Sequence, residues 1–209
     1  MTYTALLGGS FNPAHGGHRS ISLFAMKALH LDEVLWLVSP GNPLKSSKNM
    51  APLTARLASA KNMSKNRPIY ATAIEAQFGT RYTIDTLREL KRKFPKRRFV
   101  WIMGADNMAQ FHHWYKWREI ASLMPIIVVE RPTYNDKARL APSMGYLRKY
   151  VRRAGSHLVL KHNRTPTVVF LRFRPDKRSA TDIRSANPNW HDLYDDRSVW
   201  DAISRKKHV

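Results

Sequence analysis

The segment with the clearest chemistry lies near the start of the chain, where glycines and histidines are closely spaced. It reads Gly8-Gly9-Ser10-Phe11-Asn12-Pro13-Ala14-His15-Gly16-Gly17-His18 and separates a short apolar run from a stretch of helical periodicity. Paired glycines let backbone amides approach a phosphate chain, and the unsatisfied N–H groups of the following helix point to the same place. The segment lacks the Gly-Lys-Ser/Thr ending of Walker A and the three glycines of the dinucleotide fingerprint. It therefore predicts an anion cradle without kinase-like or dehydrogenase-like chemistry.

Two imidazoles in this segment could act on phosphate. His15 and His18 are three residues apart, so on a first helical turn both would face one side and could donate to the same phosphate group. Donors aimed at a phosphorus centre that gains charge stabilise the transition state more than the ground state. Two other interpretations stay open: one histidine caps the helix or packs in the core, or the pair binds zinc. For zinc, a convincing third ligand and the glutamate of a metalloprotease helix are missing.

A second candidate segment lies near the other end of the chain. It reads Ser179-Ala180-Thr181-Asp182-Ile183-Arg184, in which Ser179 and Asp182 have capping-box spacing and Arg184 follows the first helical turn. Alone, the segment is explained by a plain helix start. A helix N-terminus with Ser, Thr and Arg after the last strand could instead provide a second hold on the same phosphates.

These segments need a scaffold, and apolar runs that alternate with helical periodicity predict one. We expect strands at Thr4–Leu7, Val34–Val38, Ile69–Thr72, Arg98–Met103, Ile126–Val129 and Thr167–Phe173. We expect helices at Ile21–Leu29, Leu53–Lys65, Tyr82–Phe94 and about Gly145–Arg153, with two short helices after the last strand. The alternation predicts an α/β fold: a Rossmann-like, doubly wound, mainly parallel sheet with helices on both faces. We expect a single domain over residues 1–209, with a short C-terminal helical part from about residue 179.

The expected sheet places the candidate residues together. Ligands of such sheets bind at the carboxyl ends of the strands, near the point where the strand order reverses. One rim would then carry Gly8-Gly9, Ser39 to Pro43, Gly104 to Asn107 and Arg131. The segment from Thr133 to Pro166 is expected to be loop outside its one helix.

Composition excludes several classes of protein. The 209 residues include 36 Lys or Arg, 15 Asp or Glu and no cysteine, so disulfides, thiolate metal sites and a cysteine nucleophile are excluded. The start of the chain lacks the pattern of a signal peptide, and the longest later apolar run, Met124 to Val129, is far below the ~20 residues of a membrane span. We expect a cytoplasmic protein. Basic clusters at Lys91 to Arg98 and Arg148 to Arg153 keep nucleic-acid binding open, although no recognition module accompanies them.

The two candidate segments together resemble the signature motifs of the nucleotidylyltransferase superfamily. Gly8 to His18 is similar to its G-x-F-x-P-x-H-x-G-H motif, and Ser179 to Arg184 is similar to its I-S-x-T-x-I-R motif, about 160 residues later. Ala180 stands where the family often has Ser, and Asn12 where Asp is commoner. Further positions resemble bacterial nicotinate-nucleotide adenylyltransferases: Tyr82 to Leu87, Gly104 to Asn107, Phe111, Trp114 with Trp117, and Arg131-Pro132.

The resemblance implies roles for individual residues. The ATP site would comprise Gly8, Gly9, Ser10, Phe11, His15, His18, Gly104, Asp106, Ser179, Thr181, Ile183 and Arg184. Within it, His15, His18 and Arg184 would act on the phosphates during catalysis. Nicotinate mononucleotide would be held by Lys45, Tyr82, Thr83, Asp106, Trp114, Tyr115 and Arg131, with Trp114 stacking on the pyridine ring and the main-chain amides of Thr83 and Tyr115 receiving its carboxylate.

Some of these residues have ordinary structural explanations. Trp114 and Trp117 have helical spacing and, without the resemblance, are more typical of a core than of a ligand platform. A pyridinium ring gains roughly 0.5 to 2 kcal/mol from an indole face, which favours a ligand role for Trp114 only. Asp106 follows a strand and a glycine, so it could cap a helix, bind a ribose, or do both.

The reaction implied by the resemblance is transfer of AMP from ATP to the 5′-phosphate of nicotinate mononucleotide, with release of pyrophosphate. The nucleophile is already a phosphate oxygen, so alignment and charge neutralisation would supply most of the rate, without a covalent enzyme intermediate. We expect Mg²⁺ to arrive with the ATP phosphates, without dedicated protein ligands. We expect no membrane and no nucleic-acid partner. The alternatives are a sister transferase, such as phosphopantetheine adenylyltransferase, and a basic nucleic-acid-binding protein.

Overall fold

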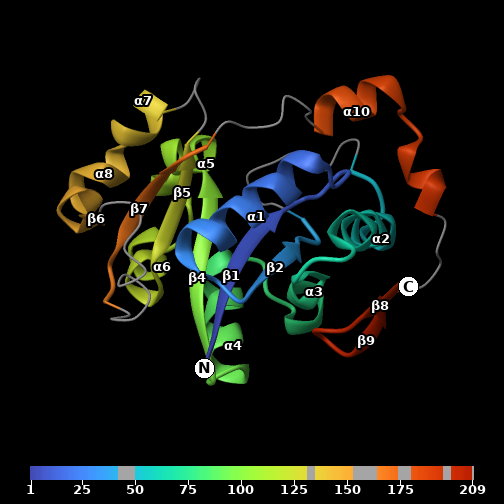
Figure 1. Ribbon diagram of the computed structural model, residues 1–209, viewed down its shortest axis with the longest axis horizontal. Coiled ribbons are helices and arrows are strands. Elements are labelled where there is room, and N and C mark those ends of the chain that lie inside the picture. The colour runs from blue at the N-terminus through green and yellow to red at the C-terminus, as the bar shows by residue number, and fades with distance from the viewer. Residues whose placement is uncertain (42–49, 131–134, 153–163, 174–179, 195–198, 209) are drawn as a thin grey trace.

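A parallel sheet of seven strands forms the centre of the molecule, in the order β3-β2-β1-β4-β5-β7-β6 (Figure 1). The computed structural model describes residues 1–41, 50–130, 135–152, 164–173, 180–194 and 199–208. Every neighbouring pair in this sheet is parallel. The strands of the sheet are β1 (Thr2–Gly9), β2 (Glu33–Val38), β3 (Ile69–Thr72), β4 (Arg97–Gly104), β5 (Ile126–Glu130), β6 (Val151–Arg152) and β7 (Val168–Arg172).

The strand order reverses between β1 and β4. From β1 the chain moves outward through β2 to β3, and it then returns to the other side of β1 as β4. The register pairs Leu6 with Trp101 and Leu7 with Ile102, so the two strands end side by side at Gly9 and Gly104. This is the switch point at which ligands of doubly wound sheets bind. The α/β fold with a mainly parallel sheet is therefore confirmed, and the first glycine pair lies at the expected rim.

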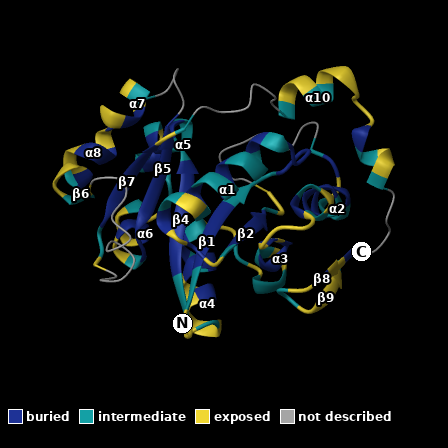
Figure 2. Ribbon diagram, in the orientation of Figure 1, coloured by how far each residue is buried: buried dark blue, intermediate teal, exposed yellow. Residues whose placement is uncertain are grey.

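Helices cover both faces of the sheet because the strands alternate apolar side chains between them. Leu7 of β1 packs in one cluster with Ile21 and Ala25, whereas its neighbour Leu6 packs in another with Ile84 and Leu87. Figure 2 shows the strands of the sheet mostly in the colour of buried residues, beside helices in which buried, intermediate and exposed residues are mixed. The described helices are α1 (Gly16–Leu29), α2 (Leu53–Ser64), α3 (Ile74–Phe78), α4 (Thr83–Lys93), α5 (Ala105–Ala109), α6 (Trp117–Leu123), α7 (Asn135–Arg139), α8 (Pro142–Leu147) and α10 (Ala180–Ala186), with 3₁₀ turns η1 (Phe111–His113), η2 (Arg148–Tyr150) and η3 (Trp190–Tyr194).

The prediction of a helix over Gly145–Arg153 is wrong in its extent. The helix α8 begins earlier, with Pro142 in its first turn, and ends at Leu147. Proline suits a first helical turn because its fixed φ is already helical and its missing N–H has no partner there in any case. After η2 the chain becomes extended, and Val151 of β6 pairs with Val168 of β7. The short helix α7 also lies in a segment expected to be loop.

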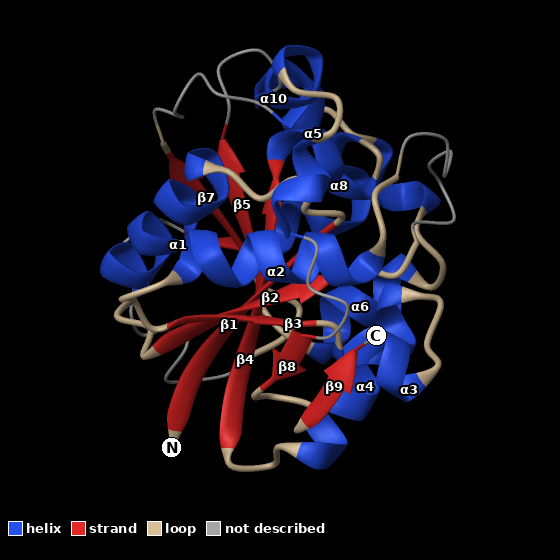
Figure 3. Ribbon diagram, turned by 90° about the vertical axis from the view of Figure 1, so that its right-hand side faces the viewer, coloured by secondary structure: helices blue, strands red, loops and turns tan. Residues whose placement is uncertain are grey.

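An antiparallel hairpin ends the described chain and docks against the carboxyl end of β3 (Figure 3). Its strands are β8 (Val199–Asp201) and β9 (Lys206–His208). The fully buried carboxylate of Asp201 accepts hydrogen bonds from the Thr72 hydroxyl and the Ala73 amide, both at 2.8 Å. These bonds fix the tail beside the start of α3. In the described part of the chain, no helix is long and apolar enough to span a membrane.

Candidate active site

The loop between β1 and α1 has an unusual backbone at Phe11. Phe11 has a φ of +48°, in the left-handed region that costs an ordinary residue about 1 to 2 kcal/mol. Its ring compensates by packing: it is 1% exposed and stacks on Trp36 at a centroid distance of 5.1 Å. Trp36 is itself fixed by a 2.8 Å hydrogen bond from its Nε1 to the Ser22 hydroxyl. The loop is therefore held in one conformation by a buried aromatic side chain.

The two histidines form the N-terminal cap of α1. His15 is the N-cap residue, and its Nδ1 accepts from the Gly17 amide at 3.1 Å. His18 Nδ1 accepts from the His15 amide at 3.2 Å, which completes a reciprocal capping box. Because both Nδ1 atoms accept, the ring hydrogen of each imidazole is on Nε2. The capping interpretation is confirmed for both histidines.

The capping bonds also bring the two rings together, as a shared phosphate site requires. Their centroids are 4.0 Å apart, at an interplanar angle of 50°. The zinc interpretation gains no support, because both Nδ1 atoms already accept main-chain hydrogens, and no group of three His, Asp or Glu suited to a metal occurs among the described residues.

The second segment reaches the same loop. Arg184 on α10 donates from Nη1 to the main-chain oxygen of Asn12 at 2.6 Å, and from Nη2 to the Thr181 hydroxyl at 3.3 Å. The two segments, 172 residues apart at this contact, therefore converge in space. Ile183 lies on the same helix, and Ser179 falls outside the described residues.

A cavity of about 270 Å³ opens at the carboxyl ends of β1 and β4. Seven of the residues predicted for the site line it: Gly8, Gly9, Ser10, Tyr82, Thr83, Trp114 and Tyr115. Seven others complete the lining: Ser39, Gly41, Glu75, Arg81, Trp101, Asn107 and His113. Phe11, His15, His18, Gly104, Asp106 and Arg184 are not part of this lining. Lys45 and Arg131 lie outside the described residues. Four of the residues assigned to the mononucleotide, Tyr82, Thr83, Trp114 and Tyr115, thus line the cavity, and Gly8, Gly9 and Ser10 of the ATP set line it with them.

The two tryptophans with helical spacing, Trp114 and Trp117, differ in their surroundings. Trp114 lines the cavity and is half-buried, held edge-on by Trp101 at 6.2 Å and by Phe111 at 5.6 Å between ring centroids. Trp117 instead packs against Phe111 and Tyr146 and does not reach the cavity. The core explanation therefore holds for Trp117, and Trp114 presents an indole to the cavity.

Close packing under the cavity explains one of the glycines. A Cβ on Gly8 would lie 2.6 Å from Cη2 of Trp101, which is closer than side chains approach. A glycine at this position leaves room for the indole of Trp101, which lines the cavity. Neither Trp101 nor this contact was predicted from the sequence, because the contact depends on the register of β1 against β4.

The structure excludes the helix-capping role considered for Asp106. Gly104 is the N-cap of α5, with no side-chain cap, so Asp106 lies in the first turn and does not cap the helix. The capping prediction is wrong because the strand ends directly at the helix, which places Asp106 two positions after the N-cap. Its Oδ1 atom is buried, without a hydrogen-bond partner among the described residues.

Glu75 on α3 brings a carboxyl group into the cavity lining. Burial raises the pKa of Glu75 to about 7, against the opposing effect of hydrogen bonds with Ser39 and Thr86. Sequence reasoning missed Glu75, because nothing in its local pattern distinguishes it from a surface glutamate at the start of a short helix.

Comparison with known proteins identifies relatives over almost the whole chain. A family model described as cytidylyltransferase-like matches residues 6–186. A protein of Erythrobacter litoralis (strain HTCC2594), named probable nicotinate-nucleotide adenylyltransferase, is 55% identical over 203 residues, which cover 97% of this chain and 93% of that protein. A protein of the same name from Parvibaculum lavamentivorans is 49% identical over 179 residues, 86% of this chain and 89% of that protein.

Solved structures share the fold. The nicotinic acid mononucleotide adenylyltransferase of Plasmodium falciparum, complexed with NaAD, superposes with a TM-score of 0.66 at 16% sequence identity, over 88% of this chain and 83% of that chain. At that identity the likeness concerns the fold alone. Because the family match covers most of the chain and includes both converging motifs, the chain belongs to the cytidylyltransferase-like family of nucleotidyltransferases.

Proposed function

We propose that the protein is a nicotinate-nucleotide adenylyltransferase, which transfers AMP from ATP to nicotinate mononucleotide and gives nicotinate adenine dinucleotide and pyrophosphate. The observation that carries the proposal is the 2.6 Å hydrogen bond from Arg184 to the Asn12 carbonyl. It brings both phosphate-binding motifs of a nucleotidyltransferase to one loop, beside a cavity lined by aromatic residues. The names of the relatives at 49 to 55% identity agree with it.

The loop between β1 and α1, together with the helices α1 and α10, would bind the phosphates of ATP. The Nε2–H groups of His15 and His18 and the guanidinium of Arg184 are donors for the ATP phosphates, with Gly8, Gly9 and Ser10 providing close backbone approach. Such donors stabilise charge that develops during transfer of the adenylyl group. Thr181, Ile183 and Ser179 would complete this phosphate-binding site. ATP would arrive as its magnesium complex.

Nicotinate mononucleotide, the acceptor, would bind in the cavity. There the pyridine ring would stack on Trp114, and the main-chain amide of Thr83, the first residue of α4, would receive the carboxylate. Tyr82 and Tyr115, whose ring centroids are 4.6 Å apart, would close the cavity beside them. Asp106, which follows β4 at the same edge of the sheet, keeps the ribose-binding role that the resemblance implies. Lys45 and Arg131 keep the mononucleotide-binding roles that the resemblance implies.

The acceptor phosphate then attacks the α-phosphorus of ATP, and the P–O bond to pyrophosphate breaks. An ionised phosphate monoester needs no general base, so holding the two substrates in line supplies the main acceleration. We place this reaction in the cytoplasm, where ATP is available, with small-molecule substrates and without a nucleic-acid partner.

A coupled pyrophosphate assay with ATP and a panel of acceptors tests the proposal. We expect release with nicotinate mononucleotide and little or none with phosphopantetheine, because the indole of Trp114 suits a flat cationic ring. Release only with phosphopantetheine would instead identify a sister transferase. No release with any acceptor, together with nucleic-acid binding that falls steeply with salt, would favour the nucleic-acid-binding alternative.

A further inference from the structure

A buried cation underlies the loops of the candidate site. Arg56 lies on the first turn of α2 and is 1% exposed. Its guanidinium donates to four main-chain oxygens: from Nε to Ala51 at 2.9 Å, from Nη1 to Ser10 at 2.9 Å and to Ser39 at 2.6 Å, and from Nη2 to Pro40 at 3.4 Å. These oxygens belong to three segments that are distant in sequence. One side chain thus joins the start of α2, the loop after β1 and the loop after β2.

Arg56 forms no ion pair with an acidic side chain of the described chain; the contacts given for its guanidinium are with carbonyl oxygens. Burial lowers the pKa of Arg56 to about 10, so the group remains charged at neutral pH. A buried charge without a counter-charge is costly, and the four hydrogen bonds of Arg56 offset part of that cost. Neutral carbonyls satisfy the donors but leave the positive charge beside the loop uncancelled.

The bond to Ser10 determines how the next peptide group points. In a planar trans peptide, the carbonyl and the following N–H point in opposite directions. Because the Ser10 carbonyl points to Arg56, the Phe11 N–H is directed to the other side, and this is the peptide that precedes the left-handed φ of Phe11. Ser39 is tied to the same place, since its amide donates to the Gly9 carbonyl at 3.0 Å. Ser10 and Ser39 both line the cavity.

We propose that Arg56 is a positioning residue, which presets the Ser10–Phe11 peptide and the loop after β2 for the nucleotide before it binds. The inference rests on the proposed function, since the value of a preset loop is its fit to an ATP phosphate chain. Arg56 does not touch the substrate. It acts through the backbone of the loop whose far end is held by Arg184 at Asn12. Two guanidinium groups therefore hold the carbonyls of one loop, at positions 10 and 12.

The matched pair Arg56→Lys and Arg56→Gln tests this role. Lysine keeps the charge, but its single ammonium group cannot donate to all three segments at once, and glutamine removes the charge as well. Arg19→Gln is the control: Arg19 also donates to two main-chain oxygens, those of Met63 and Lys65, but away from the cavity. The readouts are kcat and KM for each substrate, ATP affinity by calorimetry, and Tm. We expect both Arg56 variants to lose at least tenfold in kcat, and Arg19→Gln to lose less than threefold at a comparable loss of Tm.

Two results would overturn the proposal. The first is a kcat within threefold of wild type in a folded Arg56 variant, which would leave Arg56 a purely structural residue. The second comes from hydrogen exchange of the unaltered protein without nucleotide and stays informative if both variants fail to fold. A preset loop predicts that the peptide over residues 9–14 exchanges much more slowly than an unstructured chain, and unprotected exchange refutes it. If the wild type releases no pyrophosphate with any acceptor, the proposed function fails, and the exchange experiment still reports on the loop.

Discussion

Gly8→Ala is the substitution whose effect follows most directly from the geometry of the site. The added Cβ would lie 2.6 Å from Cη2 and 3.2 Å from Cζ2 of Trp101, whereas non-bonded carbon atoms prefer about 3.5 to 4.0 Å. The indole must therefore move by roughly 1 Å. Trp101 is 3% exposed and packs edge-on against Trp114, so the displacement is passed to the wall of the cavity.

The expected cost is that of an overpacked core, about 1 to 3 kcal/mol in the free energy of unfolding. For a domain of this length, 1 kcal/mol corresponds to roughly 2 to 4 °C in Tm. Calorimetry or urea unfolding measures the loss, and KM for the mononucleotide should rise because Trp114 moves with Trp101. Gly145→Ala is the matched control: apart from the neighbouring residues of its own helix, no atom lies within 4 Å of the position that its Cβ would take, and alanine in α8 should stabilise the helix by about 0.5 to 1 kcal/mol.

A double variant separates steric conflict from any other effect of the added methyl group. Phenylalanine at position 101 lacks the second ring that the Cβ meets, so Gly8→Ala should cost less in a Trp101→Phe background than in the wild type. Additive effects of the two substitutions, or a loss below about 0.5 kcal/mol for Gly8→Ala alone, would show that the indole is not the obstacle.

Three further substitutions test the assigned roles. His18→Ala should lower kcat far more than stability, and activity within about threefold of wild type, under ~0.7 kcal/mol in barrier, would contradict its role at the phosphates. Trp114→Ala should raise KM for the mononucleotide while ATP affinity measured by calorimetry stays nearly constant; equal losses would indicate a structural tryptophan. Glu75→Gln tests the carboxyl whose pKa is raised from 4.5 to about 7. Between these values the folded chain keeps a proton that the unfolded chain loses, so the free energy of unfolding falls as pH rises, and the Gln variant should lack that fall in urea titrations at pH 5 and 7.5.

The regular part of the fold follows from local pattern. Each long strand is a continuous apolar run, and the α4 helix carries Ile84, Leu87 and Leu90 on its buried face at the predicted spacing. Sequence reasoning missed short elements: the helices α3, α5, α6 and α7, which have five to seven residues each, and three strands that are shorter still. The strand β6 has two residues and the hairpin strands β8 and β9 have three each, and they form because a neighbouring strand or a buried Asp201 is present.

The residues of the candidate site also differ in whether the sequence predicts them. Motif residues such as His15, His18 and Arg184 could be selected because their types and spacing suit phosphate chemistry. Trp101 and Glu75 could not, since a buried tryptophan in a strand and a glutamate in a short helix have no local signal. Their positions depend on strand register and on the docking of α3, which are tertiary properties. Arg56 is the extreme case, because its partners are main-chain atoms, which no side-chain pattern encodes.

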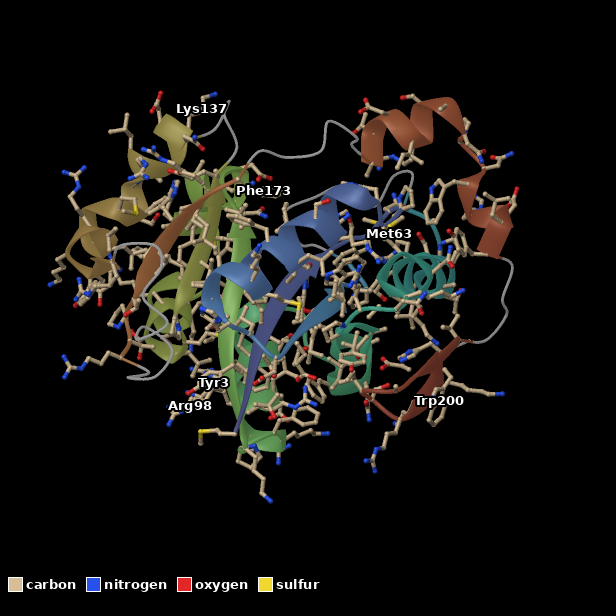
Figure 4. The ribbon with its side chains drawn as sticks, viewed as in Figure 1. Tyr3, Met63, Arg98, Lys137, Phe173 and Trp200 are labelled. Atoms are coloured by element: carbon tan, nitrogen blue, oxygen red, sulfur yellow. The ribbon has the colours of Figure 1, made fainter. Side chains whose placement is uncertain are left out.

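The distribution of the positive charge separates the structural role of the basic residues from the proposed chemistry. The cluster at Lys91 to Arg98 lies where α4 ends and β4 begins, at the opposite end of the sheet from the cavity; Figure 4 shows Arg98 there, beside Tyr3. Several of its members already have partners, as Arg97 pairs with Glu33 and Lys91 donates to the Leu123 carbonyl. Two arginines lie at the candidate site: Arg56 is buried beneath the loops, and Arg184 is hydrogen-bonded to the loop between β1 and α1. Exposed charges are screened by salt, whereas Arg184 is held at the loop itself, so the placement of this guanidinium, and not the net charge of +21, favours a nucleotide as the ligand.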